Sequence, residues 1–209
     1  MDMKTLGVVL IAAVLVATVA SEVAKRMLTR RLERSFTSGD FDACLKTVDG
    51  PVARFTIPYF NREFMRLGAL EAKQDTDEAE KVLENLLSRR SAPQQRLALL
   101  ARGFGFYVAQ SDRDKAAHML ELVEANGDKD LLCDCKQKFA IIFDKKWDYI
   151  DEMERRLPDA GLEERSQLCY LLSVQYESKG DKKRADEYLR QSLKTFGIPE
   201  EALEELGKR

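Results

Sequence analysis

The stretch LLSVQYESKGDKKRADEYL, residues 171–189, decides the fold. Tyr176 is followed by Gly180-Asp181 and, nine residues after the tyrosine, by Ala185. An Asp at a helix start accepts hydrogen bonds from free backbone N–H groups and meets the positive end of the helix dipole. An alanine lets a neighbouring helix approach closely. The stretch therefore predicts two antiparallel helices that place the tyrosine against the alanine across a short turn.

The same arrangement recurs along the chain. Short breaks with an Asp near a helix start are spaced by 35, 37, 32 and 37 residues, at Asp40, Asp75, Asp112, Asp144 and Asp181. In four units a small residue follows four positions later: Cys44, Ala79, Ala116 and Ala185. A bulky residue stands nine positions before each alanine: Leu70, Tyr107 and Tyr176. The fourth unit departs, with Asp148 in place of the alanine. A repeat of this length predicts stacked helical hairpins.

This spacing resembles the tetratricopeptide repeat, which places a small residue and a tyrosine on its first helix and an alanine on its second. The best match is residues 172–189, and the resemblance covers roughly residues 35–197. It is degenerate, because no Trp opens any unit and no Pro closes most of them. The resemblance implies a solenoid of helical hairpins whose concave face binds a segment of another protein. A helical-hairpin solenoid without that ancestry is the alternative.

The amphipathic stretches predict an all-α fold, a tetratricopeptide-like solenoid of about five hairpins. The expected helix pairs are 23–37 with 40–48, 58–72 with 75–88, 93–110 with 112–125, 129–143 with 145–157, and 162–178 with 181–195. Prolines fall in the connections, as expected of residues that break helices. We expect a repeat domain over residues 23–197, then a short polar capping helix and tail over residues 198–209.

The first residues predict a membrane anchor. Residues 5–21 carry no charge, and as a helix they would be roughly 25 Å long, the short end of what spans a bilayer. We therefore expect residues 1–22 to form a single transmembrane helix that precedes the repeats. The alternative is a cleavable signal peptide, because residues 18–21 have the small side chains of a cleavage site. The repeats would then belong to an exported or periplasmic helper protein.

A basic flank after the uncharged stretch favours the anchor. Two acidic residues accompany the cationic residues of this flank, which are Lys25, Arg26, Arg30, Arg31 and Arg34. Because positive charge prefers the cytoplasmic side of a membrane, we expect a single-pass membrane protein with its repeats in the cytoplasm. The flank would also bind anionic lipid headgroups.

Composition excludes several classes of function. The chain has 209 residues, with 34 basic and 36 acidic side chains and a net charge of -2, which argues against nucleic-acid binding. A metal site is disfavoured by the single His and by four Cys without a CxxC pair. We expect no catalytic residue, no metal and no cofactor. The alternative class, an enzyme on a helical scaffold, would depend on Asp, Glu, Lys and Cys.

The first helices of such repeats face inward, so residues between their seam positions should line the concave surface. This logic nominates as partner-binding residues Asn61, Phe64, Arg102, Gly105, Gln137, Tyr170 and Val174. Each of them also fits an ordinary packing role. The set of Lys, Asn and Arg with which some tetratricopeptide domains grip a carboxyl-terminal peptide is missing. The expected function is a membrane-anchored interaction scaffold that binds a protein or peptide segment on its concave face.

Overall fold

The computed structural model of the chain describes residues 22–23 and 25–195. These residues form helices, and no strand occurs among them. The chain divides between Leu99 and Leu100 into two compact units. Each unit has a hydrophobic core of its own.

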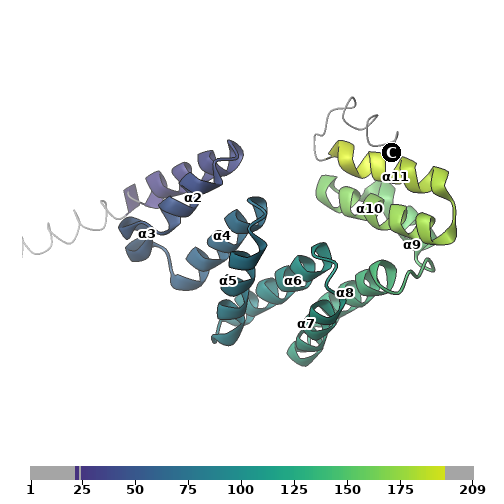
Figure 1. The fold of residues 1–209 in the computed structure, drawn as a ribbon, viewed down its shortest axis with the longest axis horizontal. Coiled ribbons are helices and arrows are strands. Elements are labelled where there is room, and N and C mark those ends of the chain that lie inside the picture. Colours follow the sequence, from purple (N-terminus) through teal and green to yellow (C-terminus); the bar gives the residue numbers. More distant parts are fainter. Residues whose placement is uncertain (1–21, 24, 196–209) are drawn as a thin grey trace, which may run out of the picture. The chain divides into compact units, whose positions relative to one another are not determined.

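The first unit opens with a helical segment, residues 25–37. It continues with α2 (Phe41–Val48), α3 (Pro51–Thr56), α4 (Tyr59–Ala72), α5 (Thr76–Ser88) and the beginning of α6 (Pro93–Ala109) (Figure 1). Leu28 and Leu32 lie four residues apart, so both point from one face of the helical segment into the core. The core that they join contains Cys44, Val48, Ala53 and Ala69.

The second unit holds the rest of α6, then α7 (Arg113–Asn126), α8 (Lys129–Ile142), α9 (Ile150–Arg156), a 3-10 turn (Leu157–Asp159), α10 (Leu162–Lys179) and α11 (Lys182–Thr195). In Figure 1, α10 and α11 run side by side as a hairpin. The core of this unit includes Ile141, Ile150, Met153, Leu168, Leu172 and Tyr176.

Four of the five predicted breaks share one turn geometry. The residue before the Asp adopts a left-handed conformation, with φ of 71°, 62°, 56° and 89° at Gly39, Gln74, Ser111 and Gly180. The N–H of the following Asp donates to the carbonyl five residues earlier, over 2.9 to 3.0 Å. The N–H of the left-handed residue donates to the carbonyl three residues earlier. Together these two bonds form the Schellman motif that ends a helix.

The same aspartates begin the next helix, as predicted. The carboxylates of Asp40, Asp112 and Asp181 accept hydrogen bonds from the backbone N–H three residues later, over 3.0, 3.0 and 3.2 Å. Asp75 occupies the same position before α5 without this side-chain bond. One residue thus closes one helix with its own N–H and starts the next helix, which keeps each hairpin turn short.

The predicted seam is buried, which confirms the packing role of its small residues. Leu70, Tyr107 and Tyr176 are all buried on the first helices of their hairpins. The small residues on the second helices are buried as well, namely Cys44, Ala79, Ala116 and Ala185. Tyr176 and Ala185 lie in the same core cluster.

In the fourth predicted hairpin the first helix is confirmed as α8, but the second helix begins later than the predicted residue 145. Asp144 does not start a helix, because α9 begins only at Ile150. The carboxylate of Asp144 instead binds the guanidinium of Arg113 at 2.7 Å. Lys145 takes the left-handed position of this turn, and the N–H of Lys146 reaches back to the carbonyl of Ala140. A tertiary ion pair therefore replaces the helix cap that the sequence pattern predicts.

The predicted transmembrane helix ahead of the repeats is contradicted. Across residues 22–23 and 25–195, no helix is both long and apolar enough to cross a membrane. The physical reason is charge, because the helical segment 25–37 carries the cationic side chains of the basic flank. The uncharged stretch, residues 5–21, and the predicted capping helix, residues 198–209, lie outside the described residues. The described residues form an all-α fold, and they do not support the predicted single-pass membrane protein.

Candidate functional site

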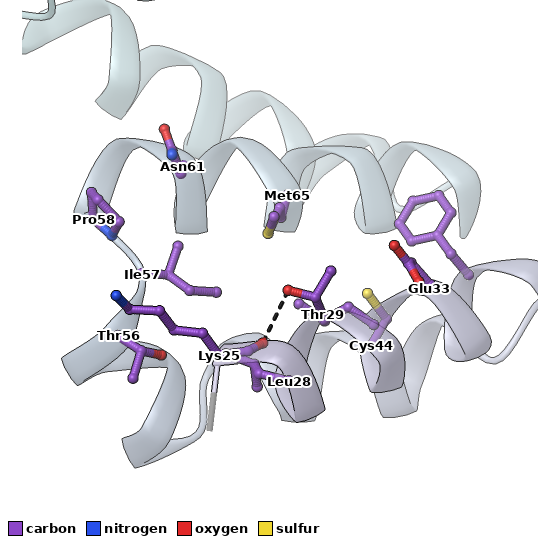
Figure 2. Close-up of a pocket in the computed structure, with 12 residues that line it drawn as sticks. Lys25, Leu28, Thr29, Glu33, Cys44, Thr56, Ile57, Pro58, Asn61 and Met65 are labelled. Carbon is purple, nitrogen blue, oxygen red and sulfur yellow. Dashed lines mark hydrogen bonds between the residues drawn. The ribbon is translucent and has the colours of Figure 1, made fainter. Parts of the chain in front are cut away.

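An apolar groove of about 480 Å³ opens on the first unit. Figure 2 shows its two walls: Lys25, Thr29 and Glu33 on the helical segment 25–37, and Pro58, Asn61 and Met65 at the start of α4. Leu28, Leu32, Phe36, Cys44, Thr56 and Ile57 complete the lining. We call this depression the Phe36–Met65 groove.

The wall on segment 25–37 follows from helical spacing. Lys25, Thr29 and Glu33 are four residues apart and so share one face of the helix. The Thr29 hydroxyl donates to the carbonyl of Lys25 over 3.0 Å, so its hydrogen is engaged within the helix. The charged ends of this wall are opposite in sign, with an ammonium at Lys25 and a carboxylate at Glu33.

The opposite wall depends on a proline. Ile57 precedes Pro58 and is extended, with φ -107° and ψ 126°, because a residue before proline avoids the helical conformation. The chain therefore leaves α3 and restarts as α4 directly after Pro58. Asn61 and Met65 then lie four residues apart on the face of α4 that lines the groove.

The groove exposes apolar side chains that the described residues of the unit do not cover. The exposed fractions of Phe36 and Met65 are 43% and 42%. Phe36 has one aromatic neighbour, Phe41, in an edge-to-face contact with 5.6 Å between ring centroids. The volume lies within the range of about 300–1,000 Å³ typical of ligand pockets. The arrangement suits the binding of apolar side chains.

The chemistry of the lining is unreactive. Burial raises the pKa of the Cys44 thiol, so this side chain remains protonated at neutral pH. Burial likewise raises the pKa of Cys169, and it raises that of Cys135 to about 12. In the described ranges, no group of three His, Cys, Asp or Glu side chains is arranged to hold a metal ion. The single histidine, His118, is exposed and lies 3.4 Å from Glu121.

A second depression, of about 640 Å³, is polar and lies between α8 and α9 in the second unit. Its lining includes three acidic side chains, Asp130, Asp134 and Glu152, and three basic ones, Lys129, Lys136 and Arg156. Because the charges balance, the depression selects neither an anionic nor a cationic ligand.

The nominated partner-binding residues divide between the two units. Asn61 lines the Phe36–Met65 groove and accepts a 3.5 Å hydrogen bond from Gln95. Phe64 stacks on Phe60, with 5.6 Å between ring centroids. Gln137 lines the polar depression and donates to Glu152 over 3.4 Å.

The other four predicted partner-binding residues do not line any of the grooves or depressions described for this structure. Val174 is half-buried against the core of the second unit. Tyr170 and Gly105 are exposed, and Arg102 is half-buried. Of the seven nominations, only Asn61 thus belongs to the apolar groove. The repeat pattern in the sequence did not predict Phe36 and Met65, the two exposed apolar residues of the groove.

A comparison of the chain with known protein families, with curated proteins and with solved structures finds no significant match.

Proposed function

We propose that this protein is an interaction module whose Phe36–Met65 groove binds the apolar face of a helix from a partner protein. The observation that carries this proposal is the groove itself: two first helices of successive hairpins leave Phe36 and Met65 exposed between them. Helical grooves of this kind receive amphipathic helices through apolar anchors at spacings of three and four residues.

The side chains of the groove support an adaptable but oriented complex. Met65 is flexible and polarisable, which suits a surface that adjusts to its ligand. Lys25 and Glu33 place opposite charges along one wall. A partner helix with an acidic residue near Lys25 and a basic residue near Glu33 is therefore favoured in one direction along the groove.

The hairpins are best interpreted as degenerate tetratricopeptide-like repeats. This interpretation is supported by the shared turn at Asp40, Asp75, Asp112 and Asp181, and by the buried small residue four positions after each Asp. A module of this kind binds its partner without reacting with it. The protonated state of the three buried thiols agrees with this interpretation, because a neutral thiol is a poor nucleophile.

Site-specific photo-crosslinking in the cells that produce the protein tests the proposal. Asn61, an exposed residue of the groove, is replaced with p-benzoylphenylalanine in the full chain. The matched control carries the same amino acid at Phe55, which is 92% exposed and lies outside the groove. We expect a discrete crosslinked species from position 61 and none from position 55. Equal crosslinking at both positions, or none at either, contradicts the proposal.

A further inference from the structure

A second groove of the first unit is apolar and basic. It has a volume of about 400 Å³ and lies where segment 25–37 meets α2 and the start of α3. We call it the Arg31–Lys46 groove. Its lining combines the exposed side chains of Met27 and Val52, which are 67% and 48% exposed, with the cationic side chains of Arg31 and Lys46. None of the described residues that line it is acidic.

The acidic residues closest in sequence to Lys46 are already engaged elsewhere. Asp42 binds the ammonium of Lys73 at 2.6 Å, and Asp49 binds the guanidinium of Arg66 at 2.7 Å. Within the described part of the chain, neither Arg31 nor Lys46 forms an ion pair, so their positive charge is available to a ligand beside the exposed side chains of Met27 and Val52. The chemistry that fits is a segment with several carboxylates and one or two apolar anchors.

The chain contains a segment of this chemistry. Residues 199–206 read PEEALEEL, with Glu at positions 200, 201, 204 and 205 and Leu at positions 203 and 206. The segment contains no basic residue. We propose that the Arg31–Lys46 groove binds residues 199–206 of a second copy of this chain, so that the protein associates with itself. Carboxylates of the segment pair with Arg31 and Lys46, and its leucines cover Met27 and Val52.

This inference does not rest on the proposed function. Among the described residues, the Arg31–Lys46 groove and the Phe36–Met65 groove share only Leu28, which is buried. A partner helix in one groove and a second copy in the other are therefore separate events, and each experiment can fail without the other.

Charge exchange in the full chain tests the inference. Sedimentation velocity over a range of protein concentrations is measured for the wild type, for R31E/K46E, for E201K/E204K and for the variant that combines all four substitutions. R90E, a charge reversal at an exposed residue outside the groove, is the matched control. Because the substituted groove positions are at the surface, we expect every variant to keep its helical content, and circular dichroism verifies this.

We expect self-association of the wild type and of R90E, and a weakening of about ten-fold or more in each double variant. The four-fold variant should associate again, because its charges are exchanged and not lost. Raising the salt from about 0.1 M to 1 M should weaken wild-type association, because the Debye length falls from about 10 Å to about 3 Å. A wild type that remains monomeric, double variants that associate like the wild type, or a combined variant without recovery would each overturn the inference.

Discussion

At the scale of single residues, the hairpin turns depend on a backbone conformation that most residues avoid. Gly180 has a φ of 89°, and Ser111 takes the same position in its turn with a φ of 56°. A side chain costs about 1–2 kcal/mol in the left-handed helical region. Glycine is therefore favoured at position 180 by the backbone conformation of the turn and not by the packing around it.

Two glycine substitutions distinguish the effect of backbone conformation on stability from the effect of packing. In Gly180→Ala the new Cβ would meet no atom within 4 Å, yet we expect a loss of about 1 kcal/mol from the positive φ alone. In Gly105→Ala, in the same unit and with equally open space, we expect a gain of up to about 1 kcal/mol because the position is helical. Urea denaturation of both variants measures the difference. A loss of stability in both would contradict this account of the turn.

Glu154 makes the stability of the second unit depend on pH. Its carboxylate accepts hydrogen bonds from Tyr176 at 2.7 Å and Tyr188 at 2.8 Å. The bond from Tyr176 is the largest cause that lowers the pKa of Glu154, with smaller contributions from Tyr188 and Arg184. A carboxyl with a lowered folded-state pKa stabilises the fold above its unfolded pKa, and the contribution is lost as the pH falls through the folded value.

We therefore expect Glu154→Gln to destabilise the chain by about 1 kcal/mol at pH 7, a value reduced for partial solvent screening. The difference in unfolding free energy between wild type and variant, here called the gap, should close as the pH falls below the ordinary carboxyl pKa of 4.5. Thermal unfolding from pH 3 to pH 7 measures the gap. Glu187→Gln, at an exposed position of α11, is the control that should show no such change. A gap that widens at low pH would reverse the assigned role of the carboxylate.

At the scale of helices, the seam of four hairpins contains a small buried residue on the second helix. Ala116 is fully buried in α7, nine residues after Tyr107 on the preceding helix. Ala116→Leu should therefore overpack the seam and cost about 1–3 kcal/mol. Ala125→Leu, at an exposed position of the same helix, should change stability by less than about 0.5 kcal/mol. Chemical denaturation compares the two, and equal effects would show that α7 does not pack through Ala116.

The helices that were predicted correctly are those whose boundaries follow from local chemistry. Glycine or another left-handed residue, a capping Asp and an alanine four positions later together specify a hairpin without any distant contact. The start of the second helix in the fourth hairpin was predicted wrongly, because the partner of Asp144 is Arg113, a residue 31 positions away. The predicted helix pairs place Pro51 in a connection, but Pro51 stands at the first position of α3, where proline is well tolerated.

At the scale of the whole molecule, the sequence pattern predicts single helices better than it predicts how helices pack within a unit. Helical periodicity indicates which face of each helix is apolar, but not which two helices leave a gap between them. Asn61 was therefore identified, whereas Phe36 and Met65 were not, because their exposure depends on the separation between segment 25–37 and α4. The uncharged N-terminal stretch led to a membrane prediction that the charged helical segment after it does not support.

Two substitutions of one chemical kind test the central claim, that the Phe36–Met65 groove binds a partner helix. Met65→Glu and Phe55→Glu each place a carboxylate at an exposed apolar position of the first unit, inside and outside the groove respectively. The yield of the species crosslinked from position 61 is measured in both backgrounds. The account predicts that Met65→Glu lowers this yield about ten-fold or more, because a carboxylate would have to be desolvated against the apolar face of the partner. Phe55→Glu should leave the yield unchanged, and equal yields in the two backgrounds would contradict the claim.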